Sequence, residues 1–189
     1  MRYIEPLSPA AAAGVVRGDR VMAINGVPAA TVITNNDFSA LTPNAVGDTL
    51  TLVLRSTAGV DRPPVTLSAT VFGLTPVQNA QILQTPNGRS IGYVTVKDMI
   101  SQVGTPLANA FATFRANNVQ ELVLDLRYTG GGLVSVGGDV ASYAAGSGGS
   151  GQYFARLFYN DKRSGNNQDF RFTNPNSWTG FAKVYVLAG

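Results

Sequence analysis

The chain has 189 residues, 44% hydrophobic and 13% charged, with a formal net charge of +3 at pH 7. This length suits one large domain or two small ones, and the composition suits packed cores rather than disorder. Because Cys and His are both absent, the sequence excludes disulfides, thiolate metal sites, a cysteine nucleophile and a Ser-His-Asp triad. The 14 Lys and Arg residues are scattered, so we expect no nucleic-acid partner, and no metal or cofactor.

The sequence contains no apolar run of the roughly 18 residues that a membrane span needs. At its start, Arg2 and Glu5 flank Tyr3-Ile4 and prolines follow, which is not the pattern of a signal peptide. We therefore expect either a cytoplasmic protein or one whose targeting segment lies outside this chain.

Residues 1–75 are predicted to form a small β-rich domain. Ser8 is typical of a helix N-cap and Gly14 of a helix stop, and Asn25-Gly26 is typical of a tight turn with positive φ. The expected strands are 21–24, 49–55 and 65–71. A short helix is expected over 35–41, capped by Asn35 or Asn36.

Residues 76–189 are predicted to form an α/β domain with parallel strands and right-handed crossovers. The expected strands are 81–84, 90–96, 121–127, 153–159, 168–173 and 183–189, of which the last is expected to be buried. Thr105-Pro106 is predicted to open a helix whose core stripe is Leu107, Ala110, Phe111 and Phe114. A second helix follows the pattern of Leu133, Val136, Val140 and Ala144, with Gly137-Gly138 as a weak point. The stretch 146–151 is low in complexity and expected to be flexible.

The stretch Glu121–Gly132 is the candidate site. Its apolar run predicts a central strand buried on both faces, followed at once by three glycines. In open α/β sheets the carboxyl ends of strands are where ligands bind, and glycines there permit close backbone approach. A purely structural alternative is a tight strand-to-helix turn in which Asp125 and Arg127 form a local ion pair.

Common phosphate-binding motifs do not fit this turn. A dinucleotide fingerprint would need glycine at Ser135, and a P-loop would need lysine at Gly138. Phosphate binding at the following helix N-terminus stays open on dipole grounds, as does a nucleotide-binding α/β protein. Neither Ser147 nor Ser150 lies in a Gly-x-Ser-x-Gly elbow.

Residues 9–26 resemble the PDZ domains of bacterial proteases. The resemblance rests on Pro9-Ala10, Ala13-Gly14, Gly18-Asp19, Val21, Ile24 and Asn25-Gly26. It implies that an extended C-terminal peptide binds by strand addition. Phe38 and Leu41 are the candidate substrate-binding side chains, with ordinary core packing as the alternative. The family's carboxylate-binding glycine loop would fall before Met1, so the chain is expected to begin inside the domain.

Ile91-Gly92-Tyr93-Val94, followed after one helix by Leu122–Gly132, resembles the C-terminal processing proteases of serine peptidase family S41. Thr129 stands where the family usually has Asn. The resemblance implies a PDZ-like domain over 1–75 and an incomplete crotonase/ClpP-like βα core over 76–189. It also implies an oxyanion hole at Gly131 and Gly132, with Gly130 beside them.

The family further implies a serine nucleophile in a Ser-Ala-Ser-Glu type motif soon after residues 183–187, with a lysine base beyond it. Neither is present, and none of Lys97, Lys162 and Lys183 matches that lysine. We therefore expect the parent to be an endopeptidase acting on protein C-termini, in the bacterial periplasm or envelope, and this fragment to be inactive. The alternative is a peptide-binding scaffold or pseudoprotease.

Overall fold

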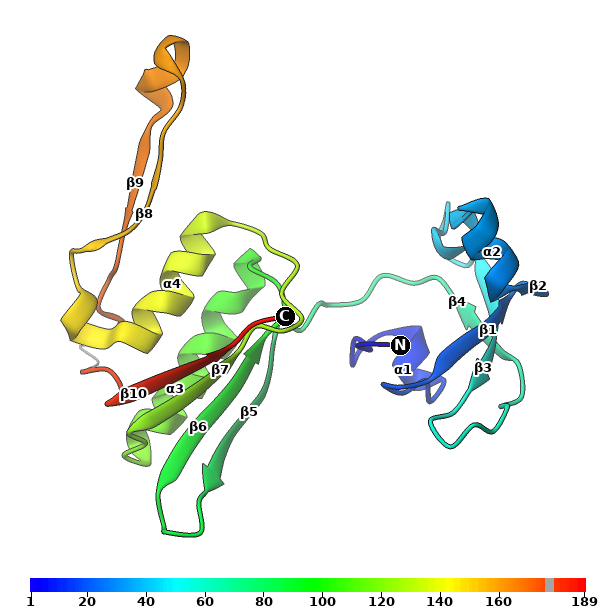
Figure 1. Ribbon diagram of the computed structural model, residues 1–189, viewed down its shortest axis with the longest axis horizontal. Coiled ribbons are helices and arrows are strands. Elements are labelled where there is room, and N and C mark those ends of the chain that lie inside the picture. Colours follow the sequence, from blue (N-terminus) through cyan, green and yellow to red (C-terminus); the bar gives the residue numbers. More distant parts are fainter. Residues whose placement is uncertain (176–178) are drawn as a thin grey trace. The chain divides into compact units, whose positions relative to one another are not determined.

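The structure is a computed structural model that describes residues 1–175 and 179–189. The chain divides into two compact units, Met1–Thr75 and Pro76–Gly189, each with its own hydrophobic core (Figure 1). Both units combine helices with sheets, so the predicted mixed α/β and β fold class is confirmed. Within the described residues, no helix has the length and apolar character needed to cross a membrane.

Unit 1 is a four-stranded antiparallel sheet of order β2-β1-β3-β4. Its elements are α1 (Pro9–Ala12), β1 (Arg20–Ile24), β2 (Val27–Pro28), α2 (Ala29–Asn35), the 3₁₀ turn η1 (Ser39–Leu41), β3 (Thr49–Arg55) and β4 (Val65–Ser68). The Ser8 hydroxyl caps α1 by accepting a hydrogen bond from the backbone N–H of Ala11 at 3.2 Å, as predicted. Asn25 and Gly26 have φ of 47° and 81°, which confirms the predicted turn.

The predicted helix over 35–41 is wrong. The helix is α2, which ends at Asn35, and Asn36 adopts the left-handed conformation (φ 51°) that terminates it. The Asp37 carboxylate then accepts hydrogen bonds from the backbone and hydroxyl of Ser39, which starts the separate 3₁₀ turn. Asparagine is favourable at both ends of a helix, and here Asn35 and Asn36 mark the C-terminal end of α2 and not the start of another helix.

A buried ion pair ties together two distant turns of unit 1. The Asp19 carboxylate is 1% exposed and accepts hydrogen bonds from the backbone of Val16 and the guanidinium of Arg62. Arg62 also donates to the carbonyl oxygen of Gly14 at 2.9 Å. The Gly18-Asp19 turn is therefore fixed against the loop between β3 and β4.

Unit 2 contains a four-stranded sheet of order β10-β7-β6-β5 and a separate hairpin of β8 and β9. Its strands are β5 (Val77–Gln84), β6 (Ser90–Val96), β7 (Glu121–Asp125), β8 (Tyr153–Leu157), β9 (Gln168–Arg171) and β10 (Lys183–Leu187). Its helices are α3 (Gly104–Ala116) and α4 (Val134–Ala145), with 3₁₀ turns η2 (Ser101–Val103), η3 (Gly146–Gly149) and η4 (Asp161–Asn166). The strands β6, β7 and β10 are parallel, as predicted, whereas β5 is antiparallel to β6.

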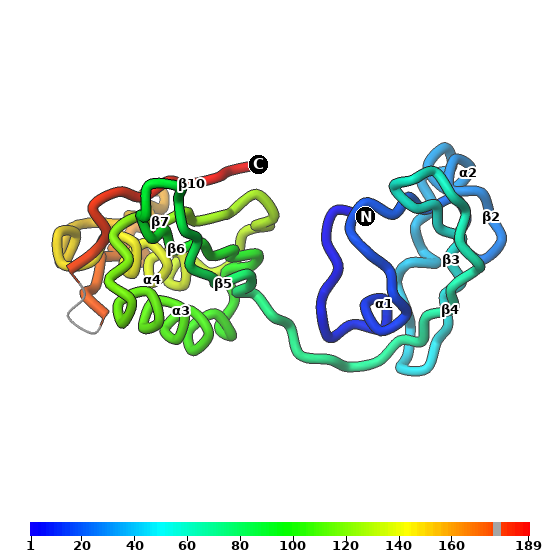
Figure 2. Tube along the Cα trace, turned by 90° about the horizontal axis from the view of Figure 1, so that it is seen from below, coloured from blue at the N-terminus to red at the C-terminus, as the bar shows by residue number. Residues whose placement is uncertain are grey.

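Helices α3 and α4 lie on the same side of this sheet (Figure 2). Alternate residues of the central strands, including Val94 and Leu124, are buried beneath the helices with the α3 stripe of Leu107, Ala110, Phe111 and Phe114. The stripe is therefore core, as predicted. Val123 is only partly buried, because neither α3 nor α4 covers the other face of the sheet, so the expectation that β7 is buried on both faces is wrong.

Two further boundaries differ from prediction. Helix α3 begins at Gly104 rather than at a Thr105 cap, because η2 runs directly into it and Val103 is already helical (φ −64°, ψ −35°). Strand β10 was predicted to be buried, but each of its residues is exposed. Among the described strands it lies at the sheet edge and pairs with β7 alone, so its apolar sequence does not correspond to burial.

The β8–β9 hairpin is attached to α4 at the predicted weak point of that helix. Phe154 packs against Gly137 and Gly138, where a Cβ would meet its ring at 3.7 Å and 3.4 Å. The Ser142 hydroxyl accepts a hydrogen bond from the backbone of Thr173 at 2.9 Å and donates one to the carbonyl of Gly138. Gly137 and Gly138, which have no side chain, therefore leave room for the hairpin to pack against α4.

The glycine-rich stretch after α4 was expected to be flexible, but it forms the packed turn η3. Gly146 is buried, with φ +60°, and a Cβ there would lie 2.2 Å from the backbone nitrogen of Gly180. A glycine is therefore required at this position.

Candidate active site

The candidate site lies at the carboxyl edge of the parallel strands. Thr95, Asp125 and Leu187 are register partners at the ends of β6, β7 and β10. From Asp125 the chain enters the turn 126–133, which leads into α4. The sheet thus delivers a carboxylate and a glycine-rich turn to the edge where α/β proteins bind ligands.

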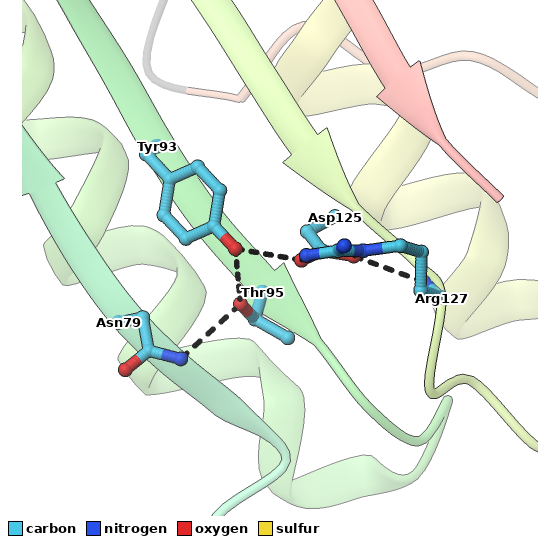
Figure 3. Close-up of polar contacts among 5 residues, drawn as sticks. All are labelled: Asn79, Tyr93, Thr95, Asp125 and Arg127. Carbon is cyan, nitrogen blue, oxygen red and sulfur yellow. Dashed lines mark hydrogen bonds and ion pairs between the residues drawn. The ribbon is translucent and has the colours of Figure 1, made fainter. Parts of the chain in front are cut away.

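Asp125 is the hub of a hydrogen-bond network at this edge (Figure 3). Its side chain is 1% exposed. Its carboxylate accepts three hydrogen bonds from Arg127, from the backbone nitrogen (3.0 Å), Nε (3.0 Å) and Nη2 (2.7 Å). The fourth comes from the hydroxyl of Tyr93 on the neighbouring strand, at 2.6 Å. The local ion pair of Asp125 and Arg127, given above as part of the structural alternative, is therefore present.

The network continues to the outer strand β5 (Figure 3). The hydroxyl of Thr95 lies 3.5 Å from that of Tyr93 and accepts a hydrogen bond from the Asn79 amide at 3.4 Å. Asn79 has φ 51° and occupies the bulge where the β5–β6 register shifts between Gln78 and Gln81. A bulge re-aims a side chain, and here it turns Asn79 toward the network.

These contacts set the charge state of the pair. The hydrogen bonds from the Arg127 side chain hold the pKa of Asp125 far below its ordinary value, although burial opposes this, and Tyr93 lowers it further. The hydrogen bond with Asp125 correspondingly raises the pKa of Arg127. Asp125 is therefore a permanent carboxylate near neutral pH and is not a general acid.

The glycine turn is held against the loop that follows β6. Gly130 donates to the carbonyl oxygen of Lys97 at 3.3 Å, and the carbonyl of Gly131 accepts from Met99 at 2.9 Å. The carbonyl oxygen of Met99 in turn accepts a hydrogen bond from the backbone N–H of Leu133 at 2.7 Å. The Thr129 hydroxyl donates to the carbonyl of Val96 at 2.5 Å, so the residue that departs from the family pattern also anchors the turn.

Two backbone donors remain at the centre of this turn. Gly131 and Gly132 have φ of +106° and +135°, which L side chains rarely adopt. Across residues 1–175 and 179–189, neither backbone N–H donates a hydrogen bond. Helix α4 begins at Val134, so the positive end of its dipole lies at the turn and favours negative charge there. The arrangement can accept a negatively charged oxygen.

The other predicted binding residues lie in unit 1. Leu41 and the apolar side chains of Leu50, Leu67 and Phe72 line a groove of about 230 Å³ that also borders α1. Phe38 does not line this groove, and both Phe38 and Leu41 are nearly half exposed, at 45% and 46%. The groove borders β4, which is the edge strand of its sheet.

Sequence reasoning did not assign Tyr93, Thr95 and Asn79 to the site. A polar pair at alternate positions of the buried strand β6 was a usable signal, because it faces Asp125 once the parallel register is known. In the described part of the chain, no three acidic, His or Cys side chains cluster as metal ligands would.

The fold of this chain is similar to the folds of two solved proteases. A Bacteroides fragilis protein described as an S41 protease matches all of this chain and 51% of its own, with a TM-score of 0.72 and 28% identity. The photosystem II D1 C-terminal processing protease matches 95% of this chain and 47% of its own, with a TM-score of 0.52. At 22% identity, this second likeness concerns the fold alone.

Residues 90–188 match the model of peptidase family S41, and the chain belongs to that family. It is 27% identical to a carboxyl-terminal-processing protease of Picosynechococcus sp. over 72% of this chain and 32% of that protein. It is 30% identical to a Synechocystis sp. protease of the same name, over 71% of this chain and 31% of that protein. The chain thus spans about a third of the curated relatives it matches.

Proposed function

We propose that this chain forms the oxyanion-binding part of a serine endopeptidase of the C-terminal-processing type. The carrying observation is the pair of consecutive N–H groups at Gly131 and Gly132 that have no acceptor in the described residues. Membership of family S41 supports the same function. The names of the relatives support C-terminal processing in particular.

The glycine turn would stabilise charge that develops during acyl transfer. When a serine attacks a peptide carbonyl, the oxygen becomes negative and needs donors that are already in place. Removing one such donor typically costs about 2.7–4 kcal/mol of transition-state stabilisation. Asp125 and Arg127 hold the first residues of the turn, so the donors need not reorganise during the reaction.

We propose that the nucleophile and a lysine base come from residues outside this chain. Lys97 is ion-paired with Asp98 at 2.7 Å, and Lys162 lies in η4, at the far end of the hairpin. Lys183 pairs in register with Glu121, at the opposite end of the sheet from the glycine turn. We therefore expect the isolated chain to be inactive.

Unit 1 is proposed to be a PDZ-like domain that binds the C-terminal segment of a protein. Its free β4 edge beside an apolar groove supports strand addition, in which the peptide backbone pairs with the edge and one side chain enters the groove. Leu41 is the proposed contact within the groove. Phe38 stays a candidate for contacts along its rim.

The peptidase proposal is tested by comparing this chain with the complete gene product on an unfolded protein substrate. We expect cleavage only by the complete product, together with labelling of one serine by a fluorophosphonate probe. Absence of both cleavage and labelling would contradict the proposal.

The peptide groove is tested by fluorescence anisotropy with a labelled peptide that ends in a free apolar residue. We expect Leu41→Asp to weaken binding about tenfold or more, because it places a charge in an apolar groove. Ile33→Asp is the matched control, since Ile33 is 66% exposed on α2 and does not line the groove. Peptide binding by a complete product that cleaves nothing would instead support the scaffold or pseudoprotease alternative.

We also propose that the protein works outside the cytoplasm, in the bacterial periplasm or envelope. The support is indirect, since the matched relatives include cyanobacterial and chloroplast proteins. Fractionation of cells that express the complete gene product tests this, and recovery only with the cytoplasm would refute it.

A further inference from the structure

Arg127 binds Asp125 through one edge of its guanidinium, and within the described residues the outer edge has no hydrogen-bond acceptor. A guanidinium carries five N–H donors in a planar fork. Asp125 engages Nε at 3.0 Å and Nη2 at 2.7 Å, which leaves the outer edge formed by Nη1. In the described residues, Nη1 has no hydrogen-bond acceptor, and the side chain is 43% exposed. A second acceptor can therefore reach this edge.

The free edge is also held in a fixed position. The guanidinium lies over Asp125 beside Tyr93 (Figure 3), on the face of the sheet that α3 and α4 leave uncovered. Its anchor is a carboxylate that is 1% exposed and that accepts four hydrogen bonds, one of them from Tyr93. A fixed donor loses less side-chain entropy when it binds a ligand than a mobile one does.

Arg55 in unit 1 provides a comparison of nearly the same geometry. Its Nε and Nη2 contact Asp61 at 2.6 Å and 3.1 Å, and its side chain is 39% exposed. Asp61, however, is 58% exposed and accepts no other hydrogen bond within the described ranges. Arg55 is therefore anchored to an exposed surface group, and Arg127 to a buried carboxylate at the end of a central strand.

The charge of the pair selects the kind of ligand. Asp125 already compensates the positive charge of Arg127, so an incoming carboxylate would meet a neutral pair and repulsion from a nearby negative charge. A neutral carbonyl oxygen meets no such repulsion and still accepts from the outer N–H groups. Extended polypeptides present such carbonyl oxygens at regular intervals.

We propose that Arg127 is a substrate-binding residue that holds a main-chain carbonyl of an extended polypeptide beside the glycine turn. This inference rests on the proposed peptidase function. Arg127 lies in the same turn, 126–133, as Gly131 and Gly132, whose N–H groups have no acceptor in the described residues, so one bound segment could contact both places. The Asp125–Tyr93 contact then serves to position Arg127.

The test measures binding separately from cleavage. Nitrogen-15 NMR of the 189-residue chain would follow the Arg127 side-chain signals during titration with an acetylated and amidated tetra-alanine peptide. Sodium acetate would be titrated in parallel. We expect the neutral peptide to shift the Arg127 signals and leave those of Arg55 unchanged. Stronger binding of acetate, or equal shifts at Arg55, would overturn the proposal.

Substitution provides the second part of the test. Arg127→Lys keeps the charge and removes the planar fork, and Arg127→Gln removes the charge as well. We expect both to weaken peptide binding about tenfold, with Arg55→Lys unchanged, and circular dichroism would verify folding. In a cleaving complete product, KM should rise in the Arg127 variants while kcat changes little. Unchanged peptide binding and unchanged KM in the Arg127 variants would refute the role of Arg127. If the wild-type complete product and all its variants fail to cleave, that result contradicts only the proposed peptidase function.

Discussion

The α-carbon of Gly132 faces the carbonyl oxygen of Met99 so closely that a Cβ on this glycine would lie 2.3 Å from that oxygen. Gly132→Ala should therefore displace the loop after β6 as well as strain its own φ of +135°. Gly131→Ala is the control, because its φ is +106° but no atom of the described residues lies within 4 Å of the added Cβ.

We expect Gly132→Ala to destabilise unit 2 by about 2–4 kcal/mol, and Gly131→Ala by about 1 kcal/mol from backbone strain. The loss of stability in each variant is measured by urea unfolding, with hydrogen exchange of the β7 amides as the probe. Equal losses in the two variants would show that the Met99 contact does not matter.

Asp125 should make the stability of unit 2 depend on pH. Its pKa is lowered in the folded state by Arg127 and Tyr93, so its contribution is complete above its unfolded pKa of about 3.9 and is lost as the pH falls toward the folded value. Asp125→Asn should cost about 1–3 kcal/mol at pH 7. The difference in stability between Asp125→Asn and the wild type should shrink below about pH 4. A constant difference in urea midpoints between pH 7 and pH 3 would contradict this.

Gly137 in α4 should tolerate alanine. A Cβ there would lie 3.7 Å from the ring of Phe154, an ordinary contact, and φ is not in the left-handed region. Because glycine is unfavourable inside a helix, we expect Gly137→Ala to stabilise unit 2 by up to about 1 kcal/mol. Gly137→Leu should instead push Phe154 away and loosen the hairpin. Calorimetry compares the two variants, and a lower melting temperature for Gly137→Ala would contradict the packing described.

Arg62→Ala should destabilise unit 1 strongly. It leaves the Asp19 carboxylate, which is 1% exposed, without its counter-charge, a change that typically costs about 3–5 kcal/mol. Arg55→Ala is a suitable control, because its partner Asp61 is 58% exposed and water can replace the lost contact. Denaturant unfolding of the two variants measures which of them loses more stability. A smaller loss for Arg62→Ala than for Arg55→Ala would show that Asp19 is stabilised in another way.

Much of the fold could be predicted because local patterns dictate it. Strand β6 begins and ends at its predicted residues, and the predicted α3 stripe from Leu107 to Phe114 is buried. The exposure of β10 could not be predicted, because an apolar strand reads the same at an edge as in the centre of a sheet. That difference depends on which neighbours the strand finds.

The site was only partly predictable for a related reason. The glycine run itself indicated a turn with unusual backbone angles, and Asp125 and Arg127 are close in sequence. The Tyr93 contact depends on the parallel register of β6 and β7. The free donors of the turn likewise depend on the Met99 bridge, and neither relation can be read from one segment alone.

The placement of the hairpin between α4 and β10 has a consequence for the order of folding. Glu121 pairs with Ile91 across one helix, but with Lys183 across a loop about twice as long that contains the whole hairpin. Doubling a loop raises its closure cost by roughly 0.6 kcal/mol, and long-range parallel pairing is slow to form. We expect β6, α3 and β7 to assemble first and β10 to join last. Until it does, the β7 edge beside the glycine turn is open to pairing with other chains.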